Sequence, residues 1–333
     1  DKYNANHGTL HQLLYSQYNK ETGQWESRME SYGSNDLIII DESSMIGMKE
    51  YDEIKREMIK QGGRVIFVGD TFQLEPVKQD DPKILQKWRE LGYQMTTVLR
   101  QAAQSGIIKW ATALRIKKGV LFPNRDADDV MIEEPGSILK LFYKDFLNKI
   151  SSIIIVAGNP TRVRVNGIVR QNIFNNPGIL EVGESLISIS NSEKRKNGQV
   201  YTLQDGFVLS DSSIDIQYND KNGNLQDVTL YAFFDENGVP QFLAPNVKEA
   251  SLTSFEITRE SLDALGEKFP EHMKKWSKDG VDRWGFGDNT NVNTYGYAIT
   301  SHKSQGGQWD NVYIYETNAS WGYGTEESRG RWL

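Results

Sequence analysis

The feature that most constrains the fold of this chain is a set of three short apolar runs, rich in β-branched residues, that each end in polar residues or glycine. The runs are residues 37–40, which end at Asp41-Glu42, residues 64–68, which end at Gly69-Asp70, and residues 153–157, which end at Gly158-Asn159. Unbroken apolar runs of this length are typical of strands buried on both faces of a parallel sheet. The sequence therefore predicts an α/β fold.

The residues between the first two runs have the periodicity of a helix. Apolar side chains recur within residues 49–61 at Tyr51, Ile54, Met58 and Ile59, and Gly62-Gly63 follows. Apolar residues three or four positions apart lie on one face of a helix, and glycine commonly ends one. Residues 37–68 are therefore predicted to form a strand–helix–strand unit, and the same periodicity predicts helices over 107–116 and 136–150.

Residues 193–245 differ from the rest because apolar and polar residues alternate there. The alternation predicts strands over 214–218 and 228–233, and Asn222-Gly223 and Asn237-Gly238 are strong signals of hairpin turns. We expect a small antiparallel β module inserted between α/β parts. After it, the pattern predicts helices over 259–269 and 270–277 and strands over 295–299 and 312–315.

The composition excludes several classes of protein. The 333 residues include no cysteine, which excludes disulfide scaffolds, thiolate metal sites and cysteine nucleophiles and suits an intracellular protein. No apolar run is long enough to span a bilayer and no cleavable signal pattern is visible, so no membrane partner is expected. The net charge of −7 argues against a protein that coats nucleic acid, but not against a local groove of clustered cations.

The acidic pair Asp41-Glu42 is the first candidate for chemistry. The predicted strand delivers both carboxylates to its carboxyl end, where open α/β sheets bind ligands. Phosphoryl transfer needs one carboxylate near Mg²⁺ and one that orients or deprotonates the attacking water. Asp41 would hold the metal, directly or through water, and Glu42 would polarise the water. The alternative is that the pair only caps the following helix.

Two further segments carry groups suited to the same reaction. Gln73 lies in the loop after the second predicted strand, where an amide can hydrogen-bond both a γ-phosphate and a water. Arg100 follows a short apolar stretch, and a guanidinium neutralises charge that develops on a transferring phosphoryl group. The alternatives are a polar loop for Gln73 and a solvated surface arginine for Arg100.

A polar loop near the carboxyl end has groups that grip a phosphate backbone. Hydroxyls, a lysine and glycine-exposed amides follow the strand predicted over 295–299, and they are Thr300, Ser301, His302, Lys303 and Gly306-Gly307. The alternative is an ordinary polar loop, in which His302 has a structural role.

Together, the order of these segments resembles that of the superfamily 1 helicases. Residues 41–45 are similar to motif II, residues 69–77 to motif III, residues 99–101 to motif IV and residues 300–306 to motif V. The wording of the motifs is typical of the RecD-like branch, which includes a phage helicase. The resemblance covers nearly the whole chain, and four motifs in order make it specific.

This resemblance implies two RecA-like parallel-sheet motor domains, the first incomplete, with a small antiparallel β-barrel-like insertion in the second. It places the first domain at 1–100, the second at 101–185 and 291–333, and the insertion at 186–290. It implies an ATP-dependent DNA helicase that moves 5′ to 3′ on single-stranded DNA, with ATP and Mg²⁺ as cofactors and DNA forks as substrates. Replication or recombination proteins are further expected partners, and the cytoplasm of a bacterium or phage-infected cell is the expected location.

Other residues take their expected roles from the resemblance alone. Residues 7–14 resemble the segment after motif Ia, and residues 158–166 resemble the strand end that opens the second motor domain. Residues 18–35 correspond to a hairpin wedge that splits duplex DNA, in which a base could stack on Trp25; the alternative is a turn residue half-buried against the domain. The implied nucleic-acid contacts are Thr9, His11, Asn159 and Arg162, and Gly306 is an implied nucleotide contact.

The chain also departs from the family pattern. No G-x-x-x-x-G-K-S/T occurs in it, so the phosphate-cradling loop is missing, and the motif VI arginine is missing as well. We therefore expect a chain that is truncated at both ends and inactive as an ATPase by itself. The alternatives are a single-stranded nucleic-acid-binding module without nucleotide turnover, and an RNA helicase or PhoH-like ATPase.

Overall fold

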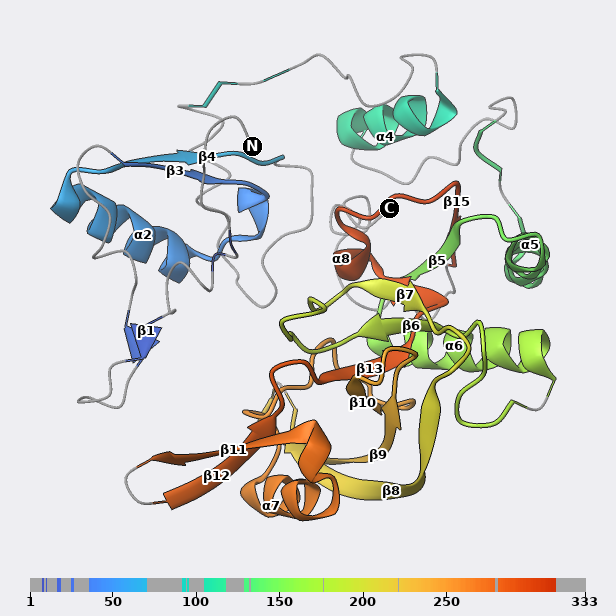
Figure 1. Cartoon of the computed structure of the whole chain (residues 1–333). Helices are drawn as coiled ribbons and strands as arrows, with labels where there is room; N and C mark the ends of the chain where they lie inside the picture. Colours follow the sequence, from blue (N-terminus) through green and yellow to red (C-terminus); the bar gives the residue numbers. More distant parts are fainter. Residues whose placement is uncertain are drawn as a thin grey trace. The chain divides into compact units, whose positions relative to one another are not determined.

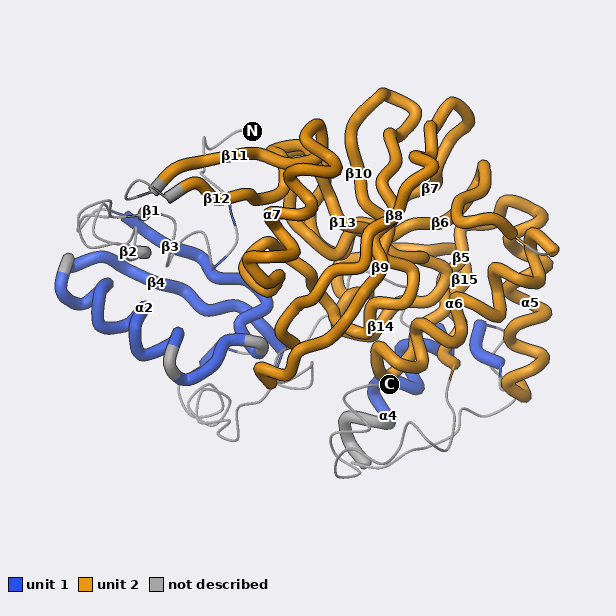
Figure 2. The backbone as a smooth tube through the Cα atoms, turned by 90° about the horizontal axis from the view of Figure 1, so that it is seen from below, with its two compact units in different colours: residues 1–131, 325–333 blue, residues 132–324 orange. Residues whose placement is uncertain are grey.

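The computed structural model describes residues 36–70, 105–117, 133–175, 177–220, 222–278 and 281–315, together with short stretches at Gly8, Leu10, 17–18, 25–26, 92–93, Met95 and 129–131. The chain divides into two compact units, residues 1–131 with 325–333 and residues 132–324, which Figure 2 shows in two colours. Each unit is described by itself. The division into motor domains and an insertion that the resemblance implies stays a prediction.

The first unit contains the predicted strand–helix–strand unit. Strands β3 (Leu37–Ile40) and β4 (Arg64–Phe67) pair in parallel, and α2 (Met48–Gln61) connects them (Figure 1). Ile54 and Met58 of α2 are buried in one cluster with Ile40. The helix ends at Gly62, whose left-handed φ of 68° is the conformation that favours glycine.

One expectation for this unit is wrong. Both strands were predicted to be buried on both faces, yet Ile39 and Ile66, which are paired in register, are 63% and 48% exposed. Successive side chains of a strand point to opposite faces, and α2 packs on the other one. Within the described residues, β3 and β4 therefore bury one face only.

Two smaller elements complete the described part of this unit. Strands β1 (Gln17–Tyr18) and β2 (Trp25–Glu26) pair antiparallel, with Tyr18 opposite Trp25. They fall at the predicted insertion of residues 18–35. Helix α4 (Gly106–Lys117) confirms the helix predicted over 107–116.

The second unit is built on a three-stranded parallel sheet. Strand β5 (Ser152–Val156) lies between β14 (Ala298–Thr300) and β15 (Asn311–Ile314). Helices α5 (Pro135–Leu147) and α6 (Asn159–Phe174) pack against β5 and against each other. Ile153, Ile154 and Val156 are buried, as predicted for this strand. The carboxyl end of β5 leads directly into α6, as expected of an α/β unit.

The β module forms a six-stranded sheet in the order β7-β6-β13-β10-β9-β8. All neighbours are antiparallel except the parallel pair β10 and β13. The edge strands β7 and β8 do not pair with each other, so the pairing is that of an open sheet. The six strands, in chain order, are β6 (Ser185–Ser188), β7 (Val200–Thr202), β8 (Val208–Asn219), β9 (Leu225–Phe234), β10 (Pro240–Leu243) and β13 (Asn291–Tyr295).

The two predicted hairpin turns are present and exposed. Gly223 and Gly238 have φ values of 81° and 71°, and they join β8 to β9 and β9 to β10. A positive φ is readily available to glycine alone among the amino acids, which is why an Asn-Gly pair is such a clear signal.

The segment after these hairpins corrects one prediction. Helix α7 (Arg259–Lys268) is present, but the helix predicted over 270–277 is wrong. A single 3-10 turn (Pro270–His272) leads instead into β11 (Met273–Lys278), which pairs antiparallel with β12 (Val281–Phe286). The ring of Trp284 on β12 covers Gly266 of α7, so the hairpin packs on that helix. Asp279-Gly280, a hairpin signal of the same kind as the other two, lies between the strands in the sequence.

The strand predicted over 295–299 is two strands in two sheets. β13 ends at Tyr295 in the six-stranded sheet, and β14 begins at Ala298 in the parallel sheet. Between them, a Cβ atom at Gly296 would lie 2.8 Å from the carbonyl carbon of Leu186. Only glycine allows this close approach, so the crossing between the sheets depends on it.

In the described parts of the chain, no helix is long and apolar enough to cross a membrane.

Candidate functional site

The acidic pair lies where β3 ends. Asp41 and Glu42 are both exposed, and the Glu42 N–H donates a 2.8 Å hydrogen bond to Asp41 Oδ1. Glu42 has a left-handed backbone, with φ 53° and ψ 35°. Glutamate rarely adopts this conformation, so the surrounding structure must hold it in place.

Ser43 provides that hold. Its Oγ lies 2.7 Å from the carbonyl oxygens of both Ile40 and Val68, and its N–H donates to the Val68 carbonyl at 2.9 Å. The Val68 N–H donates in turn to the Ile40 carbonyl at 2.8 Å. These bonds tie the ends of β3 and β4 together, so both carboxylates project from a fixed edge of the sheet.

The alternative role of the acidic pair as a helix cap is not supported. Helix α2 begins after Gly47, which has no side chain to cap it, and Glu42 makes no side-chain cap to the short 3-10 turn Ser43–Met45. An exposed carboxylate with one internal hydrogen bond, such as Asp41, fits a hard cation like Mg²⁺, which proteins often bind through one or two carboxylates, waters and phosphate. The described residues hold no cluster of three or more acidic or histidine side chains that would bind a metal alone.

Several predicted site residues lie outside the described residues, namely Thr9, His11, Gln73 and Arg100. Trp25 is described only by its backbone in β2. The roles of these five residues stay predictions.

The loop similar to motif V follows β14 in the second unit. Thr300 and Ser301 are buried, and the Ser301 Oγ has no hydrogen-bond partner among the described residues. His302 is exposed and Lys303 is half-buried in the short helix α8 (Ser301–Ser304). Gly306 follows with φ 78° and is exposed in the turn toward β15. The carboxyl ends of β14 and β5, which are parallel neighbours, therefore present this loop at one edge of the sheet.

Lys303 points back into the β module rather than into solvent. Its Nζ donates a hydrogen bond to Asn197 Oδ1, on the loop between β6 and β7. Burial, together with the smaller effect of the nearby charge of Arg162, lowers the pKa of Lys303 to about 8. A lysine with this pKa gains or loses its charge close to neutral pH.

Arg162 and Asn159, at the start of α6, are hydrogen-bonded to each other, and Arg162 also bonds to the β module. Arg162 Nε donates to Asn159 Oδ1 at 3.0 Å, and its Nη2 donates to the carbonyls of Val247 at 2.6 Å and Glu249 at 3.3 Å. Arg162 is 3% exposed, and burial lowers its pKa to about 10 although the charge of Glu249 opposes this. This burial does not favour the predicted contact between Arg162 and nucleic acid; the guanidinium fastens α6 to the segment after β10.

Asn166 is a positioning residue that sequence reasoning missed. It is buried in α6, and its Nδ2 donates to the carbonyls of Tyr295 at 2.8 Å and Ala298 at 3.1 Å. Its Oδ1 accepts from the Ala298 N–H at 2.7 Å. These bonds hold the crossing from β13 to β14, and hence the strand from which the motif V loop starts. No signal in the sequence marks it, because the buried face of α6 carries other polar side chains, those of Arg162 and Arg170, as well.

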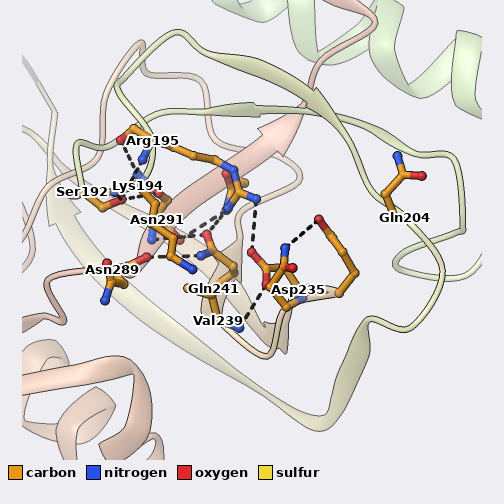
Figure 3. Close-up of polar contacts among 12 residues, drawn as sticks. Ser192, Lys194, Arg195, Gln204, Asp235, Val239, Gln241, Asn289 and Asn291 are labelled. Atoms are coloured by element: carbon orange, nitrogen blue, oxygen red, sulfur yellow. Dashed lines mark hydrogen bonds and ion pairs between the residues drawn. The ribbon is translucent and has the colours of Figure 1, made fainter.

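A polar network around Arg195 was also missed (Figure 3). The Arg195 guanidinium forms a 3.1 Å ion pair with the buried Asp235 and lies over the Tyr201 ring, 4.0 Å from its centroid. Asn291 Nδ2 donates to the carbonyls of Ser190 at 2.9 Å and Arg195 at 3.2 Å. The network fixes the loop that carries Asn197.

With this geometry in place, comparison with known proteins adds the following. A family model described as an AAA domain matches residues 1–125. The ATP-dependent RecD2 DNA helicase of Deinococcus radiodurans is 22% identical over 287 residues, which are 83% of this chain and 32% of the relative. The RecBCD enzyme subunit RecD of Buchnera aphidicola is 32% identical over 105 residues, which are 31% of this chain and 17% of that subunit. The chain thus spans about a third or less of the length of these two curated relatives.

A solved structure gives a weaker match. The crystal structure of the Pif1 helicase from Candida albicans is 16% identical, with a TM-score of 0.39, and the match covers 89% of this chain and 69% of that chain.

Proposed function

Since the chain is similar to superfamily 1 helicases of the RecD-like branch, a resemblance that the matches confirm, we propose that it forms motor domains of an ATP-dependent DNA helicase. In this proposal ATP and Mg²⁺ are its cofactors, and single-stranded DNA and DNA forks are its substrates. Movement is 5′ to 3′, coupled to strand separation. The observation that carries the proposal is the acidic pair, held at a fixed sheet edge by Ser43.

The acidic pair supports phosphoryl transfer to water. Asp41 and Glu42 are adjacent in the sequence, but the left-handed backbone at Glu42 changes the direction of the chain there. The two carboxylates can therefore take separate roles. Bound Mg²⁺ would neutralise phosphate charge beside Asp41. Glu42 would orient the attacking water and accept its proton. Gln73 and Arg100 are the proposed partners on the phosphate side.

The motif V loop supports contact with the DNA backbone. Thr300, Ser301 and Lys303 offer hydroxyls and an ammonium group, which suit phosphate and sugar better than base edges. Binding through these groups is expected to be almost independent of DNA sequence. The β1–β2 hairpin with Trp25 is the proposed wedge at the fork.

The proposal is tested by salt titration of binding to an unstructured single-stranded DNA. Lys303→Ala should weaken binding and make the log–log salt slope shallower by about 0.7, the contribution of one neutralised phosphate on a single strand. Thr300→Ala removes a hydroxyl but no charge, so it should weaken binding and leave the slope unchanged. Lys60→Ala, at an exposed position in α2, is the charge-matched control.

Two outcomes decide against the proposal. Unchanged affinity and slope for Lys303→Ala would remove this lysine from the DNA path. Preference for an RNA of matched sequence would instead favour an RNA helicase or a PhoH-like ATPase.

A further inference from the structure

We propose that Asn197 is a positioning residue that holds the Lys303 ammonium until DNA arrives, so that a DNA phosphate must displace an internal hydrogen bond to engage this lysine. The inference rests on the proposed DNA contact by the motif V loop and adds a control on that contact, supplied by the β module.

The first support is the path of the Lys303 side chain. Its Nζ donates to Asn197 Oδ1, which lies 106 positions earlier in the sequence. Its aliphatic stem passes Gly198, where a Cβ atom would lie 3.4 Å from Lys303 Cδ and 3.9 Å from Nζ. Gly198 also has φ 94°, a conformation that other residues rarely adopt. The loop between β6 and β7 is therefore shaped to receive this lysine.

The second support is the charge around the ammonium group. Its hydrogen-bond partner is a neutral amide oxygen, and the charged group that acts on it among the described residues is another cation, Arg162. The carboxylate of Glu249 acts on Arg162 and raises its pKa against the effect of burial. His302, which is next to Lys303 on α8, is exposed. A half-buried ammonium that has an amide as its partner and a cation nearby binds an anion more strongly than it binds the amide, because an anion adds the Coulombic attraction of an opposite charge, which a neutral amide lacks.

The third support is that the acceptor is held firmly. The Asn197 N–H donates to Asn191 Oδ1 at 2.9 Å, and the Gly198 N–H donates to the Ser188 carbonyl at 2.8 Å. Two residues before Asn197, Arg195 is fixed by its ion pair with Asp235 (Figure 3). Hydrogen bonds and an ion pair therefore hold the loop that positions Asn197 beside Lys303.

Asp235 connects this loop to the hairpin turn between β9 and β10. Its Oδ1 accepts hydrogen bonds of 3.0 Å from the N–H groups of Asn237 and Val239, in the turn between β9 and β10. The strength of the Lys303–Asn197 bond therefore depends on the folded β module, and through it the module sets how readily the lysine is released to a phosphate.

The test measures single-stranded DNA affinity from pH 6 to 9.5 for the wild type and for two variants of Asn197. In the wild type the contribution of Lys303 should be present below its pKa of about 8 and should be lost as the pH rises through it. Asn197→Ala should tighten binding at pH 6.5 by about 2- to 10-fold, the equivalent of one ordinary hydrogen bond that is no longer displaced. It should also move the pH midpoint down, because the ammonium loses its acceptor.

Asn197→Asp has nearly the same shape as the wild-type residue and should act in the opposite direction. Its carboxylate pairs with Lys303, so DNA binding at pH 7 should weaken by about tenfold, the fold-change of a 1.4 kcal/mol difference, and the pH midpoint should move up. Lys194→Ala, an exposed lysine on the same loop, is the control and should leave the midpoint unchanged. Thermal unfolding of each variant checks that it is folded.

The outcomes separate the two proposals. If Lys303→Ala binds DNA with wild-type affinity and keeps the pH step near 8 that the wild type shows, the proposed function of the loop fails. If Lys303→Ala weakens binding while both Asn197 variants keep the wild-type midpoint and affinity, the positioning role of Asn197 alone is overturned.

Discussion

Arg170 on α6 and Glu184 before β6 form a buried ion pair, in which Arg170 Nε lies 2.8 Å from Glu184 Oε1. The Tyr297 hydroxyl donates to the same carboxylate at 2.8 Å, and Arg170 Nη2 donates to the Gly178 carbonyl at 2.6 Å. The pair thus joins the helix, the β module and the crossing between the two sheets.

Arg170→Ala should destabilise the protein by about 3–5 kcal/mol, because it leaves the buried Glu184 carboxylate without its cation. Urea unfolding measures this free energy. Arg259→Ala is the matched control, since Arg259 forms an exposed pair with Asp263 and should contribute at most about 1 kcal/mol. Equal losses for the two variants would show that burial does not decide the effect.

Gly296→Ala should lower the free energy of unfolding by about 1–3 kcal/mol or more, because its Cβ would overlap the backbone of Leu186. Gly167→Ala, in the middle of α6 with nothing within 4 Å of its Cβ, should instead stabilise the protein by up to about 1 kcal/mol. Denaturant midpoints of both variants check the contrast. A neutral Gly296→Ala would mean that the two sheets separate easily at this point.

Asp145→Asn should destabilise the protein in a pH-dependent way. Asp145 Oδ2 accepts hydrogen bonds from Ser152, Asn311 and Tyr313 at 3.0, 2.6 and 2.6 Å. Burial raises the pKa of this carboxyl group, but the three hydrogen bonds outweigh burial and hold the pKa below its usual value. A depressed pKa contributes stability above the unfolded-state value near 3.9 and loses it as the pH falls through the folded-state value.

The loss for Asp145→Asn should therefore be about 1–3 kcal/mol at pH 7, where the charged acceptor is replaced by a neutral one, and should shrink toward pH 3. Unfolding free energies at pH 3, 5 and 7 test this. A loss of the same size at all three values would exclude a role for the charge.

Glu42→Gln should slow ATP hydrolysis by about 10²–10⁴-fold, because the amide cannot accept a proton from water. The measurement requires a polypeptide that joins this chain to a phosphate-binding loop. ATP and DNA binding should be retained, since the side-chain volume is nearly unchanged. Loss of nucleotide binding together with normal turnover of the bound fraction would contradict the role of Glu42.

The parts of the fold that follow from local pattern could be predicted from the sequence. The apolar run at 153–157 is the centre of a parallel sheet, and Gly223 and Gly238 turn where Asn-Gly pairs predict. Asp41 and Glu42 follow β3 and are exposed, as the order of strand and loop predicts. These features depend on neighbours in the sequence.

The features that could not be predicted depend on contacts between distant segments. Residues 273–278 form a strand because β12 and α7 offer partners, a tertiary effect that outweighs their helical spacing. Arg162 donates to carbonyls more than 80 positions away, a contact that no local pattern indicates. Asn166 and Asn197 have no motif that marks them, and their importance appears only when their partners are known.

The crossing at Gly296 has a mechanical consequence. Two residues separate β13 from β14, and Asn166 grips the backbone on both sides of them. This connection is short and hydrogen-bonded, so it restricts independent movement of the six-stranded sheet relative to the parallel sheet. A rotation of β14 that moves Thr300 is therefore expected to move the six-stranded sheet with it.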